Sequence, residues 1–211
     1  MLKQLIELMD NSIKIHIIIG STRPNRFSEK PAQYIYDELK KEAGVQAELI
    51  DLRDWPLPFF NEAGSPGMLK GNYTNDLAKQ WSAKIAEADA FIVVTPEYNH
   101  GYPAVLKNAF DWLYPEWNHK PIGFAGYGNA DGARAIEQLR QVVIELQMHP
   151  IKSSVHIPVD ILITAIMNKD AAMDYAELFK PLRQTRGVDR IKVFFDELIG
   201  LTRTLKGIHK E

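Results

Sequence analysis

Cysteine is absent from this chain of 211 residues. Without cysteine a protein forms no disulfide, offers no thiolate nucleophile and binds no metal through thiolate ligands. Disulfide-stabilised secreted domains and cysteine-dependent enzymes are therefore excluded, and a reducing, cytoplasmic setting is expected. The 6 histidines show no paired spacing of the kind that metal ligands require, so we expect no metal site.

An excess of charge of one sign and long apolar runs are also absent. The formal net charge is -2 and the isoelectric point is about 6.3, so no basic field attracts nucleic acid or an anionic membrane surface. No apolar run reaches the roughly 18 residues of a membrane-spanning helix, and the N-terminal residues lack the cleavage site of a signal peptide. We therefore expect no nucleic-acid partner and no membrane attachment.

Five apolar runs typical of buried strands alternate with segments of helical spacing. We predict strands at residues 13–20, 45–52, 90–95, 120–128 and 155–159. We predict helices at residues 28–44, 75–89, 103–113 and 132–148. Strands that alternate with helices form parallel sheets with right-handed crossovers. The pattern predicts an α/β fold with a doubly wound, five-stranded parallel sheet of order 2-1-3-4-5 and helices on both faces.

Three parts of the chain lie outside this alternation. Residues 53–73 are rich in proline, glycine and aromatic side chains, and loops of this length are often functional. We expect residues 1–12 to be an N-terminal extension and residues 13–159 to be one domain. We expect residues 160–211 to be a C-terminal extension that packs on this domain or on a neighbouring subunit. Its spacing at residues 190–207 predicts a helix.

The loop "GSTRPNRFS" (residues 20–28) joins the first predicted strand to the first helix. Its hydroxyl and guanidinium groups, placed at the N-terminus of a helix, are suited to hold a phosphate. The alternative is a serine-rich helix cap with solvated arginines. Because the loop follows the first strand of a doubly wound sheet, near the point where the strand order reverses, it lies where such folds bind ligands.

Two further loops follow the third and fourth predicted strands. In "VVTPEYNHGYPAVLKNAFDWL" (residues 93–113) an apolar strand passes through a polar loop into an amphipathic helix. The segment "GYGNADG" (residues 126–132) is either a ligand-facing turn or a plain connection, and its glycines lack the G-x-G-x-x-G spacing of a dinucleotide-binding loop. Because loops at the carboxyl ends of parallel strands meet at one edge of the sheet, a ligand site is expected there.

Three segments in this order, "GSTRPNRFS", "TPEYNHGYPAVLKNAFDWL" and "GYGNADGARAIEQLR", resemble the NAD(P)H-dependent FMN reductase family of flavodoxin-like proteins. The resemblance extends over residues 13–159. It implies a flavodoxin-like fold, FMN as the cofactor and NADPH or NADH as the co-substrate. The electron acceptor would be a small molecule such as a quinone, an azo compound or free flavin.

The resemblance also implies which residues contact FMN. The phosphate would be held by Ser21, Arg23, Arg26 and Ser28. One side of the isoalloxazine ring would lie against Pro96, Glu97, Tyr98 and Asn99. The other edge of the ring would be closed by Gly126, Tyr127 and Gly128. Since a bound flavin performs the electron transfer itself, no catalytic side chain is expected, and we favour a structural role for Glu97.

Two other functions are compatible with the same sheet. A flavodoxin-type electron carrier would not react directly with a nicotinamide, but the arginines of "GSTRPNRFS" disfavour it because a carrier is expected to be more acidic and to have a T-G-N-T-like phosphate loop. A phosphate hydrolase lacks a visible nucleophile. 

A homodimer or homotetramer is expected. The resemblance suggests a subunit contact through the helix at residues 103–113, on which Trp112 looks exposed. The aromatic segment at residues 53–73 would add to this contact and cover the flavin ring of a neighbouring subunit. All four tryptophans are expected in the core or at an interface: Trp55, Trp81, Trp112 and Trp117.

Overall fold

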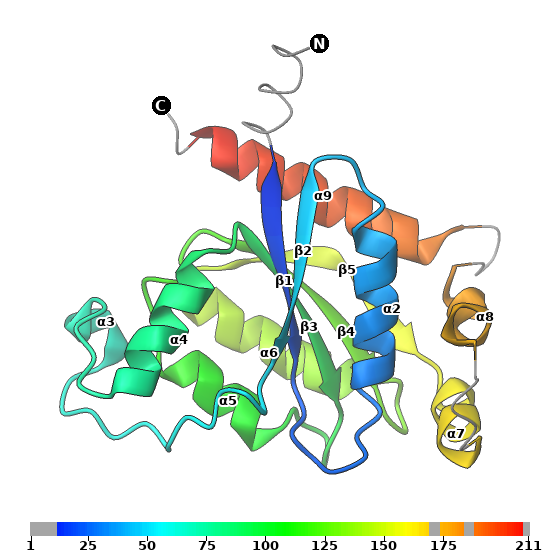
Figure 1. The fold of residues 1–211 in the computed structure, drawn as a ribbon, viewed down its shortest axis with the longest axis horizontal. Helices are drawn as coiled ribbons and strands as arrows, with labels where there is room; N and C mark the ends of the chain where they lie inside the picture. The colour runs from blue at the N-terminus through cyan, green and yellow to red at the C-terminus, as the bar shows by residue number, and fades with distance from the viewer. Residues whose placement is uncertain (1–11, 169–173, 184–187, 209–211) are drawn as a thin grey trace.

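The computed structural model of the protein describes residues 12–168, 174–183 and 188–208. Five parallel strands in these ranges form one sheet (Figure 1). They are β1 (Ile13–Ile19), β2 (Val45–Asp51), β3 (Ala90–Pro96), β4 (Pro121–Tyr127) and β5 (His149–Ile157). The order β2-β1-β3-β4-β5 confirms the prediction. The order reverses between β1 and β3, so the loops that follow these two strands flank the switch point.

Burial explains which strands are easily recognised in the sequence. Every residue of β3 and of β4 is buried, because both strands lie inside the sheet and are covered on both faces. The edge strand β5 mixes buried and exposed residues and begins at His149 rather than at the predicted residue 155. The first half of β5 is hard to recognise in the sequence because it contains Pro150, and proline is rare in strands but tolerated at a sheet edge.

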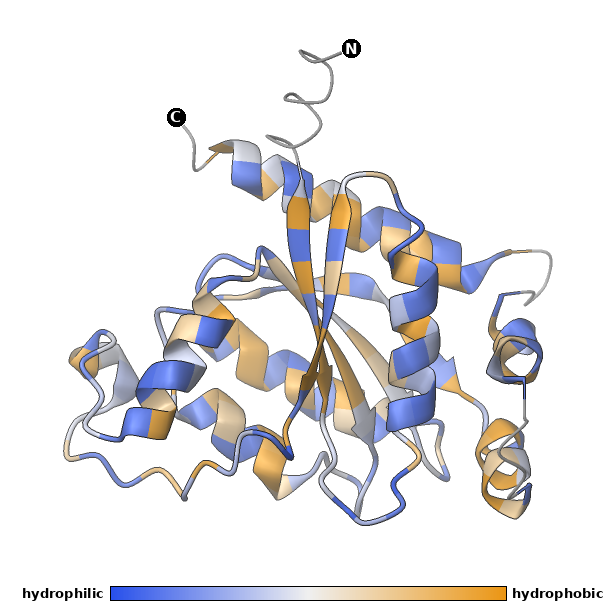
Figure 2. Cartoon of the chain, in the orientation of Figure 1, coloured by the Kyte–Doolittle hydropathy of each residue, from blue (hydrophilic) through white to orange (hydrophobic). Residues whose placement is uncertain are grey.

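Helices cover both faces of the sheet, as predicted (Figure 1). One face carries α2 (Glu29–Leu39) and α9 (Arg190–Ile208). The other face carries α4 (Asp76–Ala86), α5 (Ala104–Asp111) and α6 (Ala133–Glu145). The remaining helical elements are α3 (Pro66–Leu69), α7 (Val159–Met167), α8 (Tyr175–Phe179) and a 3-10 turn (Lys180–Leu182). Apolar side chains accordingly concentrate in the strands (Figure 2).

Three tryptophans belong to the core of the chain itself. Trp81, Trp112 and Trp117 are fully buried, so the expectation that Trp112 is exposed for a subunit contact is wrong. The indole N–H of Trp112 donates a hydrogen bond of 2.6 Å to the carbonyl oxygen of Pro58, and the amide of Asn108 donates to the same oxygen at 2.9 Å. Part of the aromatic segment is thus attached to α5 of its own chain.

The predicted helical C-terminal extension is present, and its last helix packs on the sheet. Phe194 and Leu198 of α9 are fully buried in the same cluster as β1 and α2. Phe194 packs on Gly123 of β4, where an added Cβ would lie 2.5 Å from the ring atom Cζ. The helices α7 and α8 follow β5 in the sequence and precede α9, and they lie beside α2 (Figure 1).

The expected N-terminal extension lies outside the described residues except for Ser12. The division of the chain at residues 12 and 159 stays a prediction. No helix within the described ranges combines the length and the apolar character that crossing a membrane requires.

Candidate functional site

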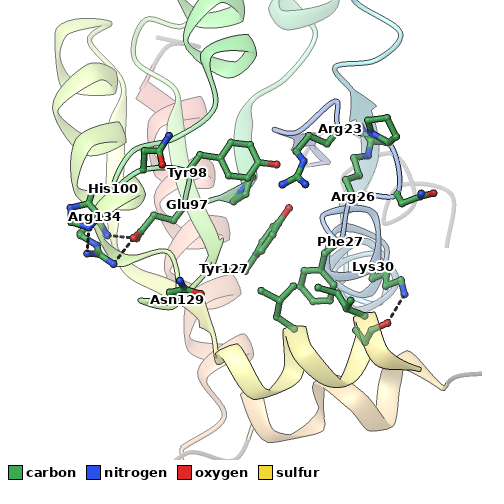
Figure 3. Close-up of a pocket in the computed structure, with 18 of the residues that line it drawn as sticks. Arg23, Arg26, Phe27, Lys30, Glu97, Tyr98, His100, Tyr127, Asn129 and Arg134 are labelled. Carbon is green, nitrogen blue, oxygen red and sulfur yellow. Dashed lines mark hydrogen bonds and ion pairs between the residues drawn. The ribbon is translucent and has the colours of Figure 1, made fainter. Parts of the chain in front are cut away.

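A pocket of about 980 Å³ opens at the carboxyl ends of β1, β3 and β4 (Figure 3). The loops that follow these three strands line it, and α7 and α8 supply a further wall. In a doubly wound sheet the carboxyl ends of the strands meet at one edge, beside the point where the strand order reverses. The pocket therefore lies where this architecture binds ligands.

Unusual backbone conformations concentrate in the three loops. Of the 7 non-glycine residues with positive φ in the described part of the chain, four lie there: Asn25, Asn99, His100 and Asp131. Asparagine, aspartate and histidine tolerate this left-handed region better than other side chains do. Asn99 and His100, with φ angles of 50° and 69°, form the centre of a tight turn. Such conformations cluster at ligand sites, where the surrounding structure holds them in place.

The loop after β1 offers a buried hydroxyl and an unpaired guanidinium. Ser28 is fully buried, and its Oγ makes no hydrogen bond of 3.5 Å or less among the described residues, although the Tyr127 hydroxyl lies close enough to interact with it. Arg23 forms no ion pair in the described ranges, and its guanidinium carbon lies 5.4 Å from the ring centroid of Tyr98. A buried hydroxyl with no hydrogen bond of normal length points to a missing ligand or water, and the adjacent N-terminus of α2 favours an anion. These groups fit the phosphate of FMN.

Arg26 is instead bound by the protein. Its Nη1 donates to Asp51 Oδ1 at 2.7 Å and its Nε donates to Glu29 at 2.9 Å, while the carbonyl of Ser21 accepts a further bond. Burial works against the charge of Arg26, but Asp51 and Glu29 outweigh it and raise the pKa of the guanidinium. Arg26 therefore attaches the loop to the end of β2, although it also lines the pocket.

Glu97 and Tyr98 attach the loop after β3 to its neighbours. The carboxylate of Glu97 is 4% exposed, lies 2.7 Å from Nη2 of Arg134 and accepts the backbone N–H of Arg134 at 3.1 Å. The backbone N–H of Glu97 donates to the carbonyl of Tyr127 at 2.8 Å. The hydroxyl of Tyr98 lies 2.9 Å from Oγ of Ser21. These contacts support a structural role for Glu97 and connect all three loops.

Close backbone contact shapes the loop after β4. Gly132 has a φ of 75°, and a Cβ there would lie 2.5 Å from the backbone of Gly126. Because neither Gly126 nor Gly132 has a side chain, the start of α6 can approach β4 closely. Tyr127 packs edge-on against Phe27, with ring centroids 4.9 Å apart. Burial raises the pKa of the Tyr127 hydroxyl, so this group keeps its proton and can donate a hydrogen bond.

The pocket gathers most of the residues that the resemblance implies. Those on its surface are Arg23, Arg26, Pro96, Glu97, Tyr98, Asn99, Tyr127 and Gly128. The remaining three are buried behind or beside it: Ser21, Ser28 and Gly126. Their contacts with FMN stay predictions.

One side of the pocket consists of residues that were not predicted from the sequence. Phe27 and Lys30 line it at the start of α2, and their position directly after the phosphate loop was an available signal. Further lining residues come from α7, α8 and the segment between them: Leu162, Ala165, Ile166, Asn168 and Tyr175. No motif marks these residues.

One group of possible metal ligands lies outside the pocket. His16, Glu48 and Glu87 bring ligand atoms within 4.8 Å of one another, which sequence spacing could not show. However, Lys84 lies 3.0 Å from Glu48, and Lys14 lies 2.7 Å from Glu87. Two lysines thus balance two carboxylates, and the group has no excess negative charge to attract a cation.

Comparisons with known proteins identify the family of the chain. Residues 13–160 match the model of the NADPH-dependent FMN reductase family. An NAD(P)H-dependent FMN reductase of Schizosaccharomyces pombe is 36% identical over 183 residues, which cover 86% of this chain and 90% of the relative. An NADPH:quinone oxidoreductase of Arabidopsis thaliana is 32% identical over 142 residues, covering 65% of this chain and 69% of the relative.

A solved structure shows the same fold at lower identity. The flavoenzyme NAD(P)H:(acceptor) oxidoreductase of Paracoccus denitrificans is 20% identical, with a TM-score of 0.54 and coverage of 94% of this chain and 98% of that chain. The fold is therefore flavodoxin-like, and the match over residues 13–160 shows that the chain belongs to the NADPH-dependent FMN reductase family.

Proposed function

We propose that the pocket holds FMN with its phosphate on the loop of residues 20–28 and its ring between the loops after β3 and β4. The observation that carries this proposal is Arg23, which lines the pocket near the N-terminus of α2 and has no acidic partner among the described residues, with the buried Ser28 hydroxyl behind the pocket surface. As a member of its family, the chain is an NAD(P)H-dependent oxidoreductase that uses FMN. The quinone oxidoreductase among its relatives supports a quinone as the acceptor.

Bound FMN supplies the redox chemistry, taking a hydride from the nicotinamide and returning two electrons to the acceptor. The residues of the chain position the reactants. Arg23 and Ser28 would bind the phosphate, and the turn at Asn99 and His100, which Arg134 and Gln138 contact, would position the ring. In the net reaction NAD(P)H, a proton and a quinone give NAD(P)+ and a hydroquinone, so no side chain has to act as a nucleophile.

Anaerobic spectroscopy tests this function. The protein is loaded with FMN, freed of excess flavin and mixed with NADPH or NADH without oxygen. The visible flavin band should bleach within the turnover time and return when a quinone is added. A flavin band that stays unbleached with both nucleotides would contradict the reductase assignment and favour the electron carrier.

We also propose a homodimer or homotetramer in the cytoplasm. The absence of cysteine supports the compartment, which cell fractionation would check. The segment of residues 53–73 supports the oligomer, because Phe59 is 80% exposed and Met68 is 77% exposed. Contiguous apolar patches mark interfaces, whereas single exposed apolar side chains are common on monomers, so the measured mass decides. Light scattering should give at least twice the mass of one chain, and a monomer that binds FMN and oxidises NADPH would contradict the oligomer.

A further inference from the structure

The pocket contains two cations that have no acidic partner among the described residues. Four cationic side chains line it: Arg23, Arg26, Lys30 and Arg134. Arg26 is paired with Asp51 and Glu29, and Arg134 is paired with Glu97. Among the described residues, no carboxylate lies within 4.0 Å of the side-chain nitrogens of Arg23 or Lys30. Two anionic groups of a ligand could therefore neutralise these two unpaired cations.

Lys30 is separated from Arg23 along the pocket wall. Figure 3 shows Arg23 at one end of the pocket, and Lys30 with Phe27 at the end next to α7. The Nζ of Lys30 donates to the backbone carbonyl of Ala165 at 3.3 Å and lies 5.0 Å from the ring centroid of Tyr175. Lys30 also stands in the first turn of α2, where its charge adds to that of the helix dipole. This end of the pocket therefore attracts an anion of its own.

An apolar wall faces this second cation. Leu162, Ala165 and Ile166 of α7 line the pocket opposite Phe27, with Tyr175 of α8 next to them. Ile166 remains 61% exposed at the pocket edge, and Figure 2 shows that most of α7 is apolar. An aromatic ring bound here would contact aliphatic and aromatic side chains while a negative substituent reached Lys30.

We propose that this second lobe, formed by Phe27, Lys30, Leu162, Ala165, Ile166 and Tyr175, binds an aromatic group that carries a phosphate or sulfonate. The inference rests on the proposed function, since the group belongs to the molecule that reacts with the flavin. Two sources share this chemistry. One is the adenosine of NADPH, whose 2′-phosphate NADH lacks, and the other is an anionic aromatic acceptor. In either case Lys30 and α7 determine which substrate the enzyme prefers.

Two substitutions with different mechanisms test the second lobe. Lys30→Met removes the cation and keeps the aliphatic stem, whereas Ile166→Glu places a negative charge in the lobe at an exposed position. Steady-state KM values are measured for NADPH and NADH, and for a naphthoquinone sulfonate and the unsubstituted naphthoquinone. In one of the two pairs, both variants should raise KM about tenfold for the member that carries the 2′-phosphate or the sulfonate and less than twofold for the member that lacks it. Their kcat values and the Kd for FMN should stay within twofold.

Direct binding identifies the source independently of turnover. Adenosine 2′,5′-bisphosphate and naphthalene sulfonate are titrated into the FMN-loaded protein by calorimetry. Weaker binding of the bisphosphate to both variants assigns the lobe to NADPH, and weaker binding of the sulfonate assigns it to the acceptor. Ile163→Glu is the matched control, because Ile163 lies on the same helix, is 47% exposed and is not among the residues that line the pocket.

Two outcomes would overturn the proposal. If all four KM values and both titrations match those of Ile163→Glu, the lobe binds no anionic group. If Lys30→Met weakens FMN itself by tenfold, Lys30 belongs to the phosphate site instead. Both outcomes are distinct from failure of the proposed function, which the unsubstituted protein would show as a flavin that NAD(P)H does not bleach.

Discussion

Arg23 and Arg26 belong to one short loop but differ in what surrounds their charges. Arg23 is exposed and forms no ion pair among the described residues. Arg26 is 6% exposed and joins the loop to Asp51. A cation already held by carboxylates gains less from a phosphate than an unpaired one does. We therefore interpret Arg23 as a ligand of the phosphate and Arg26 as a positioning residue.

Substitution separates these two roles. Arg23→Ala should weaken FMN binding about tenfold or more, because a charge-assisted hydrogen bond contributes roughly 1.5–3 kcal/mol, and it should leave riboflavin binding and unfolding unchanged.

Arg26→Ala should lower the free energy of unfolding by about 3 kcal/mol, because it leaves Asp51 without its buried partner. Fluorescence quenching and urea unfolding measure both effects. Equal affinity of the unsubstituted protein for FMN and riboflavin would remove the phosphate assignment.

His16 makes stability depend on pH. Burial lowers its pKa from 6.5 to about 4, and Lys84 and Lys14 act in the same direction against Glu48. As pH falls below 6.5, the unfolded chain binds a proton that the folded chain refuses until about pH 4. The free energy of unfolding should therefore fall by up to about 1.4 kcal/mol per pH unit across this window and be insensitive to His16 above it.

The His16→Gln variant isolates this contribution. Glutamine keeps a neutral polar side chain and cannot titrate, so its unfolding free energy should decline less steeply between pH 6.5 and 5 than that of the unsubstituted protein. Urea unfolding at several pH values gives both slopes. Identical slopes would show that other groups cause the acid sensitivity.

At the scale of elements, α9 depends on a glycine in β4. Gly123→Ala would place a Cβ at 2.5 Å from Phe194 Cζ and 3.2 Å from Ile151 Cδ1, and overpacking of this kind costs about 1–3 kcal/mol. Gly200→Ala, on α9 itself, has no atom within 4 Å of the new Cβ and should stabilise the helix by about 0.5–1 kcal/mol. Thermal unfolding should thus shift in opposite directions. A shift of the same sign in both variants would contradict this packing.

The sequence predicts elements best where burial is uniform. β3 is an almost continuous apolar run, β4 is apolar with two glycines, and β1 is interrupted only by Lys14 and His16, so all three could be located, and the βα alternation indicates a parallel sheet. Only the end of β5 was predicted, from residue 155 onward. Its first half was missed because an edge strand needs fewer apolar residues and tolerates Pro150. The exposed Trp112 was a wrong inference, since periodicity shows which face of α5 is apolar but not that residues 57 and 58 cover it.

Some features of the candidate site could be predicted from the sequence, and others could not. The three loops could be located because each follows a recognisable strand, and the residues Asn99 and His100 match the backbone conformation they adopt. The pairing of Arg26 with Asp51 could not be predicted, because it joins the ends of two strands that only the fold brings together. The wall formed by α7 has no local signal beyond its apolar residues.

At the scale of the whole molecule, one pocket has to serve two substrates. The loops after β1, β3 and β4 occupy one side of it, and α7 and α8 close another. Once FMN is bound, the ring face left open and the second lobe remain for either the nicotinamide or the acceptor. The two substrates should therefore bind at this site one after the other, and bound FMN would supply the electron transfer.

This arrangement predicts ping-pong kinetics. Double-reciprocal plots of rate against NADPH or NADH, at several fixed quinone concentrations, should be parallel lines. The oxidised nucleotide should compete with the quinone, because both bind the same open face of the pocket. Lys30→Met should keep the lines parallel while it changes their spacing or slope, because it alters affinity and not the order of events. Intersecting lines would show instead that the nicotinamide and the quinone occupy the pocket together and that the second lobe holds one of them beside the other.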